Sequence, residues 1–277
     1  MEKIEFRKVR DFSGILNGTF EFIRQNFKII FKSTVFIVGP FILLAGVFGG
    51  LYQSKVFSFR TEIDTSGFLL HLSLYYFSLV LALLVLVIVN YSIVEEYINS
   101  DLETIEVENV WEGVKRNFGK IFLTGIGYSF FVLLASLFFF IPGIYLGIAL
   151  STIFMVRIFE QKGFFDSFSR CTSIIKNNWW FTFGLIIVLG LIEGFLTFIF
   201  QIPTYIVMFA TTLSGINYQS PGDSNPSSIL FIITSIISSF GFIFYSISVV
   251  GIAFQYFNLV ERRDATGLMA KIDTIRE

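Results

Sequence analysis

Six long apolar segments dominate this chain and restrict it to one class of fold. They cover residues 33–53, 68–94, 121–141, 143–159, 179–213 and 227–260. A helix that crosses the hydrocarbon of a bilayer needs roughly 20 apolar residues, because each residue adds about 1.5 Å. Charged residues make up only 15% of the 277 residues, well below the share of about a quarter in soluble domains. The sequence therefore predicts an all-α polytopic helical membrane protein with six transmembrane helices.

A short pattern occurs three times, each time just before a pair of these segments. It consists of a basic residue, one intervening residue, an asparagine and an aromatic residue, at 24–27, 115–118 and 176–179. We call these the elbow segments. Apolar residues also stand four and eleven positions before each aromatic residue, which is typical of one stripe of an α-helix.

This repetition predicts three copies of one unit, an amphipathic interfacial helix followed by two spans. The copies cover about residues 11–97, 102–160 and 163–260, and residues 261–277 form a cytoplasmic tail. All of them belong to a single integral membrane domain, residues 1–277.

Lys and Arg are distributed unequally between the two sides of the predicted membrane. Eighteen of the 20 precede the first segment or follow an even-numbered one, and only Lys55 and Arg60 fall on the other side. Cytoplasmic loops are the ones enriched in Lys and Arg. We therefore expect a multi-pass protein of the bacterial inner (plasma) membrane, with both termini and all three elbow segments in the cytoplasm.

The elbow segments supply a candidate cytoplasmic interface. Its residues are Arg24, Asn26, Lys115, Arg116, Asn117, Lys176 and Asn178. Interfacial helices of this kind can present their charged face to a partner protein or to anionic lipid. They can also simply lead the chain into the bilayer, with the asparagines satisfying backbone groups at the bend. The sequence leaves both interpretations open.

One acidic residue, Glu193, lies near the middle of the fifth segment. A carboxylate at that depth costs on the order of 3 kcal/mol unless it is paired, hydrogen-bonded or protonated. With Gln201 and Gln255 it forms a candidate intramembrane polar site. Such a site could bind a cation, relay a proton or hold a lipid headgroup, or Glu193 could only bridge to a neighbouring glutamine or serine.

Pairs of glycines four residues apart occur inside several segments, and this spacing lets another helix come close. Gly190 and Gly194 flank Glu193 and predict that the glutamate lies on a packed face. The pairs Gly46/Gly50 and Gly143/Gly147 predict helix packing alone. Pro142 and Gly143 separate the third segment from the fourth and predict a tight hairpin turn.

The residue inventory supports no catalytic, cofactor-binding or metal site. There is one histidine, His71, and no sequence motif of a hydrolase, nucleotide-binding or zinc-dependent enzyme. Cys171 is the only cysteine, so no internal disulfide can form. The net charge of −1 and the scattered basic residues give no indication of nucleic-acid binding. The expected partners are membrane lipid and a cytoplasmic or membrane protein, and the sequence leaves the oligomeric state open.

Three stretches resemble a known group of proteins. They are the hairpin 141–146, the surface helix 163–179, and the run 256–263 followed by Gly267 and Leu268. The chain resembles uncharacterised bacterial polytopic membrane proteins related to the membrane domain of glycerophosphoryl diester phosphodiesterases. The resemblance implies a six-helix membrane module. It does not imply hydrolysis, because the chain lacks the length for a phosphodiesterase barrel and the histidines and acidic clusters of such a site.

These observations predict a non-enzymatic scaffold or accessory subunit that presents its cytoplasmic interfacial helices. The alternative is a transporter or channel for a small solute or lipid, with Glu193 lining the path.

Overall fold

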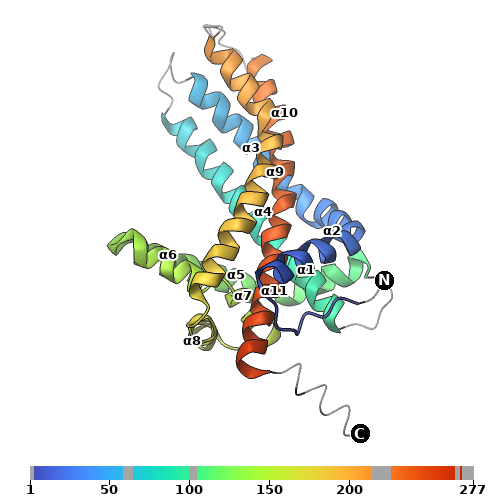
Figure 1. The fold of residues 1–277 in the computed structure, drawn as a ribbon. Coiled ribbons are helices and arrows are strands. Elements are labelled where there is room, and N and C mark those ends of the chain that lie inside the picture. The colour runs from blue at the N-terminus through green and yellow to red at the C-terminus, as the bar shows by residue number, and fades with distance from the viewer. Residues whose placement is uncertain (1–2, 59–64, 100–104, 214–225, 266–268, 270–277) are drawn as a thin grey trace. The chain divides into compact units, whose positions relative to one another are not determined.

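The computed structural model describes residues 3–58, 65–99, 105–213, 226–265 and 269, and within these ranges every regular element is a helix (Figure 1). The elements are α1 (Phe12–Gln25), α2 (Phe27–Ser33), a π-helical turn (Thr34–Val38), α3 (Gly39–Ser58), α4 (Thr65–Asn99), α5 (Val107–Phe138), α6 (Phe140–Ala149), α7 (Ile153–Phe159), α8 (Phe164–Ile175), α9 (Trp179–Leu213), α10 (Pro226–Phe240), a 3-10 turn (Gly241–Phe244) and α11 (Tyr245–Asp264). Six helical stretches are long and apolar enough to cross a membrane: Phe27–Val56, Thr65–Asn99, Val107–Leu137, Phe140–Phe159, Trp179–Leu213 and Ser228–Asp264. The chain is therefore an all-α, multi-pass membrane protein, as the sequence predicts.

The hairpin between α5 and α6 turns at a different residue from the predicted one. The two helices end and begin on either side of Phe139, whose backbone is extended with φ −158° and ψ 143°. The tight hairpin predicted between the third and fourth segments is confirmed, but its turn lies at Phe139 and not at Pro142 and Gly143. Both residues lie in the first turn of α6, where the missing N–H of proline costs no helical hydrogen bond. The packing role predicted for Gly143 is confirmed, because a Cβ there would lie 2.0 Å from Ser136 Oγ and 3.0 Å from Ser136 Cα of α5.

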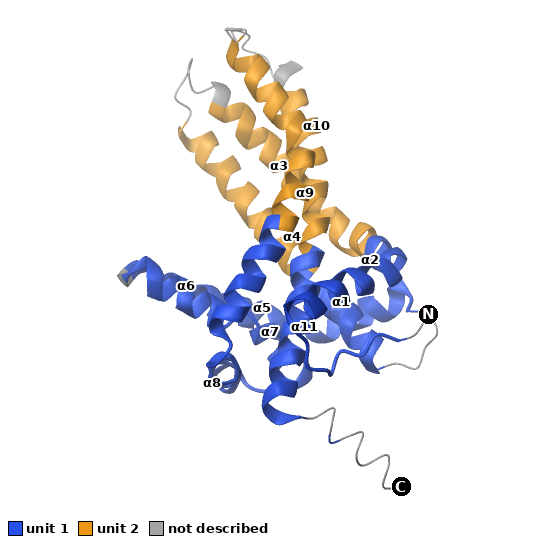
Figure 2. Cartoon of the chain, viewed as in Figure 1, with its two compact units in different colours: residues 1–33, 87–191, 246–277 blue, residues 34–86, 192–245 orange. Residues whose placement is uncertain are grey.

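The chain divides into two compact units (Figure 2). Unit 1 comprises residues 1–33, 87–191 and 246–277, and unit 2 comprises residues 34–86 and 192–245. Helices α4 and α9 contribute residues to both units. The boundaries of the units fall inside helices and do not follow the three predicted repeats.

In unit 2, two glycines bring α3 and α10 into close contact. A Cβ at Gly46 would lie 2.7 Å from Ile236 Cα, and a Cβ at Gly50 would lie 2.3 Å from Ile232 Cα. Side chains larger than hydrogen are excluded at both positions because the obstacle is backbone. The packing role predicted for this glycine pair is confirmed.

In unit 1, α11 forms the centre of the core. Every residue of 246–261 except Ile252 is buried. The ring of Phe254 stacks on Phe6, with centroids 4.2 Å apart. Phe6 belongs to residues 3–11, which precede the first helix, and we call this stretch the N-terminal strap. The strap is therefore part of the core, because its one buried aromatic side chain lies against the central helix.

The three elbow segments differ in how the chain leaves them. The first breaks between α1 and α2 at Asn26, whose side chain donates a hydrogen bond to the Phe22 carbonyl at 3.0 Å. The third breaks at residues 176–178, between α8 and α9. The second has no break, because α5 runs through Asn117 without interruption. The bend predicted there is wrong, and Asn117 donates instead to Glu95 Oε2 at 2.8 Å.

Candidate functional site

The linker between α8 and α9 carries two exposed polar side chains between two pockets of unit 1. The Asn178 carbonyl accepts hydrogen bonds from the Thr182 backbone N–H at 2.9 Å and from its hydroxyl at 3.0 Å. The first of these is the first backbone hydrogen bond of α9, and the second brings the Thr182 hydroxyl to the same carbonyl, so together they join the end of the linker to the helix. Lys176 and Asn177 are left exposed to solvent.

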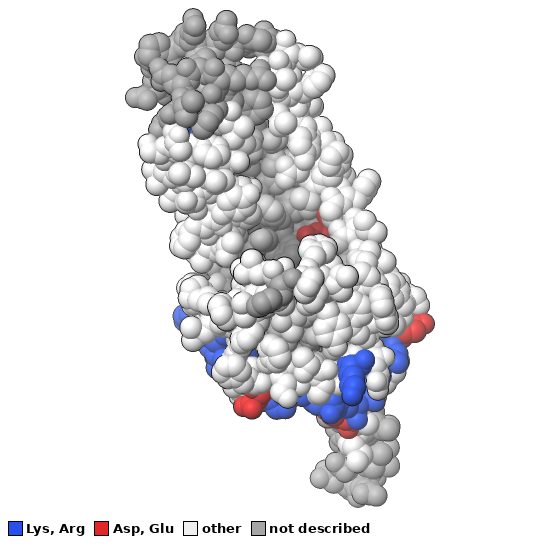
Figure 3. Space-filling view, turned by 90° about the vertical axis from the view of Figure 1, so that its left-hand side faces the viewer, with Lys and Arg blue, Asp and Glu red and all other residues white. Residues whose placement is uncertain are grey.

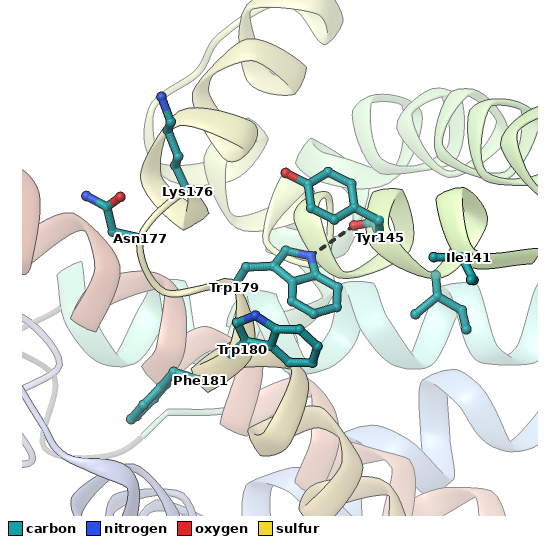
Figure 4. Close-up of a pocket in the computed structure, with 8 residues that line it drawn as sticks. Ile141, Tyr145, Lys176, Asn177, Trp179, Trp180 and Phe181 are labelled. Carbon is teal, nitrogen blue, oxygen red and sulfur yellow. Dashed lines mark hydrogen bonds between the residues drawn. The ribbon is translucent and has the colours of Figure 1, made fainter.

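On one side of the linker lies a pocket of about 430 Å³ that is mostly aromatic and apolar (Figure 4). We call it the aromatic pocket. Its lining residues are Ile141, Ile144, Tyr145, Lys176, Asn177, Trp179, Trp180 and Phe181. The Trp179 indole N–H donates to the Tyr145 carbonyl at 3.2 Å, and the two rings stack with centroids 5.4 Å apart. This pair joins α6 to the start of α9, which fixes the wall of the pocket.

A second pocket of about 390 Å³, which we call the basic pocket, also borders the linker. It is lined by Ser173, Ile174, Lys176, Asn177, Asn178, Leu259, Arg262 and Arg263. Three of these side chains are cationic and none is acidic. Arg263 donates to Ser173 Oγ at 2.6 Å, which ties the end of α11 to α8. Lys176 and Asn177 line both pockets.

A carboxylate at the end of α7 binds side chains of α8 and α11, the two helices that carry residues of the basic pocket. Glu160 lies 2.7 Å from Lys162 Nζ and 3.0 Å from Arg170 Nε, and it accepts a hydrogen bond from the Tyr256 hydroxyl at 3.2 Å. Arg170 also pairs with Asp264 of α11. Burial raises the pKa of Glu160, but hydrogen bonds from Lys162 and Arg170 outweigh it and hold that pKa below its usual range. The carboxylate is therefore ionised at neutral pH and joins α7, α8 and α11.

A buried hydrogen-bond network fastens the N-terminal strap to α11. Gln255 donates to Thr182 Oγ1 at 2.7 Å and accepts from the Asn258 amide at 3.1 Å. Asn258 Oδ1 accepts from the Arg10 backbone N–H at 2.9 Å and from Arg262 Nε at 3.1 Å. Arg262 in turn donates to the Arg10 carbonyl at 2.8 Å. Gln255, a member of the predicted intramembrane polar site, thus connects the strap, α9 and α11.

The predicted interface residues of the second elbow segment differ in what they contact. Arg116 Nη2 lies 2.9 Å from Glu95 Oε2 and 3.3 Å from Glu96 Oε1. Asn117 is fully buried and bonds to the same Glu95. The two residues hold α5 to α4, and a partner protein has no access to Asn117. Lys115 is exposed.

Two members of the predicted intramembrane polar site belong to unit 2. Glu193 and Gln201 belong to the part of α9 in unit 2, and both are half-buried. The glycine pair beside Glu193 does not itself approach another helix. Gly190 and Gly194 are exposed, and a Cβ at either would meet no described atom of another residue within 4 Å.

Neither Glu160 nor the aromatic pocket was predicted from the sequence. Trp179 and Trp180 follow each other at the start of a span, which is where interfacial aromatic residues gather. Glu160 follows a span directly and precedes Lys162, so its position beside a basic residue at a membrane boundary was also a signal. Neither signal identifies the partners, because Tyr145 and Arg170 come from other helices.

The chain was compared with protein-family models, curated proteins and solved structures, and none of the three comparisons gives a match.

Proposed function

We propose that this protein is a non-enzymatic scaffold or accessory subunit of the bacterial inner membrane. In this proposal it presents a basic cytoplasmic surface, formed by Arg24, Lys115 and Lys176 of the three elbow segments, to an acidic surface of a partner protein. All three side chains are exposed. On the face shown in Figure 3, the Lys and Arg side chains gather at one end of unit 1.

The observation that carries the proposal is the contrast between exposed cations and apolar surface on the same elements. The aromatic stripe residues Phe20, Phe27, Trp111 and Phe118 are between 39% and 59% exposed. Exposed aromatic side chains beside exposed cations suit a helix that lies in the headgroup region. The backbone behind them is held by the packing of unit 1, so the cations would be offered on a rigid support.

The cytoplasmic orientation of the elbow segments and the three repeats in the sequence are part of this proposal. In this proposal the α5–α6 hairpin stays on the cytoplasmic side, because Tyr145 near its tip accepts a hydrogen bond from Trp179 at the third elbow segment. All three elbow segments then share that side with both termini. The resemblance to the membrane domain of glycerophosphoryl diester phosphodiesterases supports a membrane module without chemistry of its own, and we propose that relationship as well.

Cysteine labelling in intact cells tests the orientation. We expect Asp166→Cys on α8 to react with an impermeant maleimide only after the inner membrane is opened, and Val56→Cys at the end of α3 to react without opening. Native Cys171 will stay unlabelled in both cases, because it is fully buried and burial raises the pKa of its thiol to about 12. At neutral pH this leaves about a thousandfold less thiolate than in an exposed cysteine. Reaction of Asp166→Cys in unopened cells would contradict the cytoplasmic orientation.

Photo-crosslinking in cells tests the scaffold role. A photoreactive residue at Lys28 or Glu112, both exposed beside elbow segments, should give a defined protein adduct, and the same residue at Val56 should not. We expect Arg24→Glu with Lys115→Glu to reduce the adduct at least about tenfold, since like charges at a docking surface repel. An adduct that persists unchanged in the charge-reversed protein would refute the proposal.

Glu193 on α9 favours the second candidate, a transporter or channel for a small solute or lipid. For that function, Glu193→Gln should abolish rescue of a deletion strain, while the charge-reversed protein should still rescue it. The scaffold role predicts the opposite pair of results.

A further inference from the structure

We infer that the aromatic pocket and the basic pocket together bind one anionic phospholipid. The phosphate of this lipid lies among the three cations of the basic pocket, and one of its acyl chains lies in the aromatic pocket. The inference extends the proposed function by a lipid site at the third elbow segment, and it rests on that function in placing this segment at the cytoplasmic leaflet.

The basic pocket has the charge and the fixed geometry that a phosphate requires. Arg262 is held in place by its bonds to Asn258 and to the Arg10 carbonyl, so its guanidinium is positioned before any ligand arrives. Lys176 has no ion-pair partner among the residues that the structure describes. Asp264 lies 3.9 Å from Arg263 Nε, but it also binds Arg170. The charge of the pocket is therefore not cancelled by its neighbours.

The start of α9 adds a second attraction for an anion. Trp179, Trp180 and Phe181 occupy its first turn, where backbone N–H groups have no partner within the helix. The helix dipole also places partial positive charge at this end. Both effects act in the same direction as the three cations.

The aromatic pocket distinguishes a lipid from a free phosphate. Trp180 is 77% exposed and Ile141 is 78% exposed, so a water-soluble anion would leave this apolar surface uncovered. Figure 4 shows Lys176 and Asn177 on the linker, pointing away from the rings of Trp179 and Trp180. The polar side chains of the linker therefore point away from the apolar rings. A phospholipid matches this arrangement, because its charged headgroup and its apolar acyl chains are joined in one molecule. Tryptophan also prefers this depth of the membrane.

Tryptophan fluorescence can test the inference, because two of the three tryptophans line the aromatic pocket and the third, Trp111, can be replaced by phenylalanine. The full chain with Trp111→Phe is placed in phosphatidylcholine nanodiscs that contain a minor fraction of brominated lipid. We expect brominated phosphatidylglycerol to quench the remaining fluorescence more strongly than brominated phosphatidylcholine at the same fraction. Removing two of the three cations with Lys176→Gln and Arg263→Gln should weaken this preference by at least about tenfold, since each cation contributes about fivefold.

The matched control removes two exposed cations outside the pockets, with Lys28→Gln and Lys115→Gln, and should keep the preference. Glycerol phosphate in solution should not compete with the brominated lipid. Equal quenching by the two brominated lipids, or a preference that survives Lys176→Gln with Arg263→Gln, would overturn the inference. Competition by glycerol phosphate would show a site for a soluble phosphate and would also overturn it. Lipid in a nanodisc reaches both sides of the protein, so this experiment does not depend on the orientation in the cell. Absence of the phosphatidylglycerol preference, together with an intact crosslink in cells, would refute the lipid site without refuting the scaffold.

Discussion

Replacing Gly50 with alanine will lower the free energy of unfolding by about 3 kcal/mol, because forced overpacking in a tight core costs on that order. A Cβ at Gly50 would lie 2.3 Å from Ile232 Cα, 2.6 Å from its backbone N and 2.8 Å from the Phe231 carbonyl oxygen. None of these atoms is the end of a flexible side chain, so α3 and α10 must move apart. In detergent, the apparent melting temperature should fall by roughly 10 °C.

Gly194→Ala is the matched control for this substitution. Gly194 also lies inside a long apolar helix of unit 2 and also has a glycine four residues away, but a Cβ there would meet nothing within 4 Å. Alanine favours the helix over glycine by up to about 1 kcal/mol, so this protein should be as stable as the parent or slightly more stable. Equal destabilisation by Gly50→Ala and Gly194→Ala would contradict the close packing of α3 on α10.

The second large effect is expected from Asn258→Ala. The substitution removes the acceptor of the Arg10 backbone N–H and of Arg262 Nε, and the donor to Gln255 Oε1. Buried groups left without a partner cost about 1–3 kcal/mol each. We therefore expect a loss of about 3 kcal/mol in the free energy of unfolding, since Arg262 can recover part of its hydration.

The rate of trypsin cleavage in the N-terminal strap measures the effect of Asn258→Ala locally. In the parent protein, the backbone on both sides of Arg10 is hydrogen-bonded, and its guanidinium lies 5.0 Å from the Phe254 ring centre. Trypsin should cut slowly after Arg10 in the parent and at least about tenfold faster in Asn258→Ala, because cleavage requires local opening. Asn177→Ala changes an exposed asparagine of the linker and should leave both stability and cleavage unchanged. Slow cleavage in Asn258→Ala would show that the network does not hold the strap.

The run at 256–263, one of the three stretches that carry the resemblance in sequence, makes several contacts within unit 1. Tyr256 bonds to Glu160, Asn258 bonds to the strap, and Arg263 bonds to Ser173 of α8. These three contacts lead to three different segments of unit 1. In this structure the run therefore has a structural role, which is to fasten the N-terminal strap, α7 and α8 around the end of α11.

Glycine spacing shows how far sequence reasoning reaches in this protein. The same four-residue spacing occurs at Gly46/Gly50, where another helix covers it, and at Gly190/Gly194, where both glycines are exposed. Spacing states only that a helix can come close. Whether one does depends on which face of which neighbour is available, and that is a property of the whole assembly of helices.

In the elbow segments, too, the local sequence does not decide which partner a side chain binds. One pattern of residues gives a helix break at Asn26, an uninterrupted helix at Asn117 and a three-residue linker that ends at Asn178. An asparagine side chain can bond to its own backbone or to a distant partner with similar energy. At Asn117 the nearby carboxylate of Glu95 provides that partner, and it stands 22 residues away along the chain.

The class of fold followed from the sequence because it depends on local quantities. The length and hydropathy of each apolar stretch decide whether a helix can cross a bilayer, and no knowledge of neighbouring helices is needed. The two pockets and the Glu160 anchor were decided only by tertiary packing. The residues of the pockets come from α6, α8, α9, α11 and the linker before α9, and Glu160 directly follows α7. A charge or a ring acquires its role only when the other helices bring its partners within contact distance.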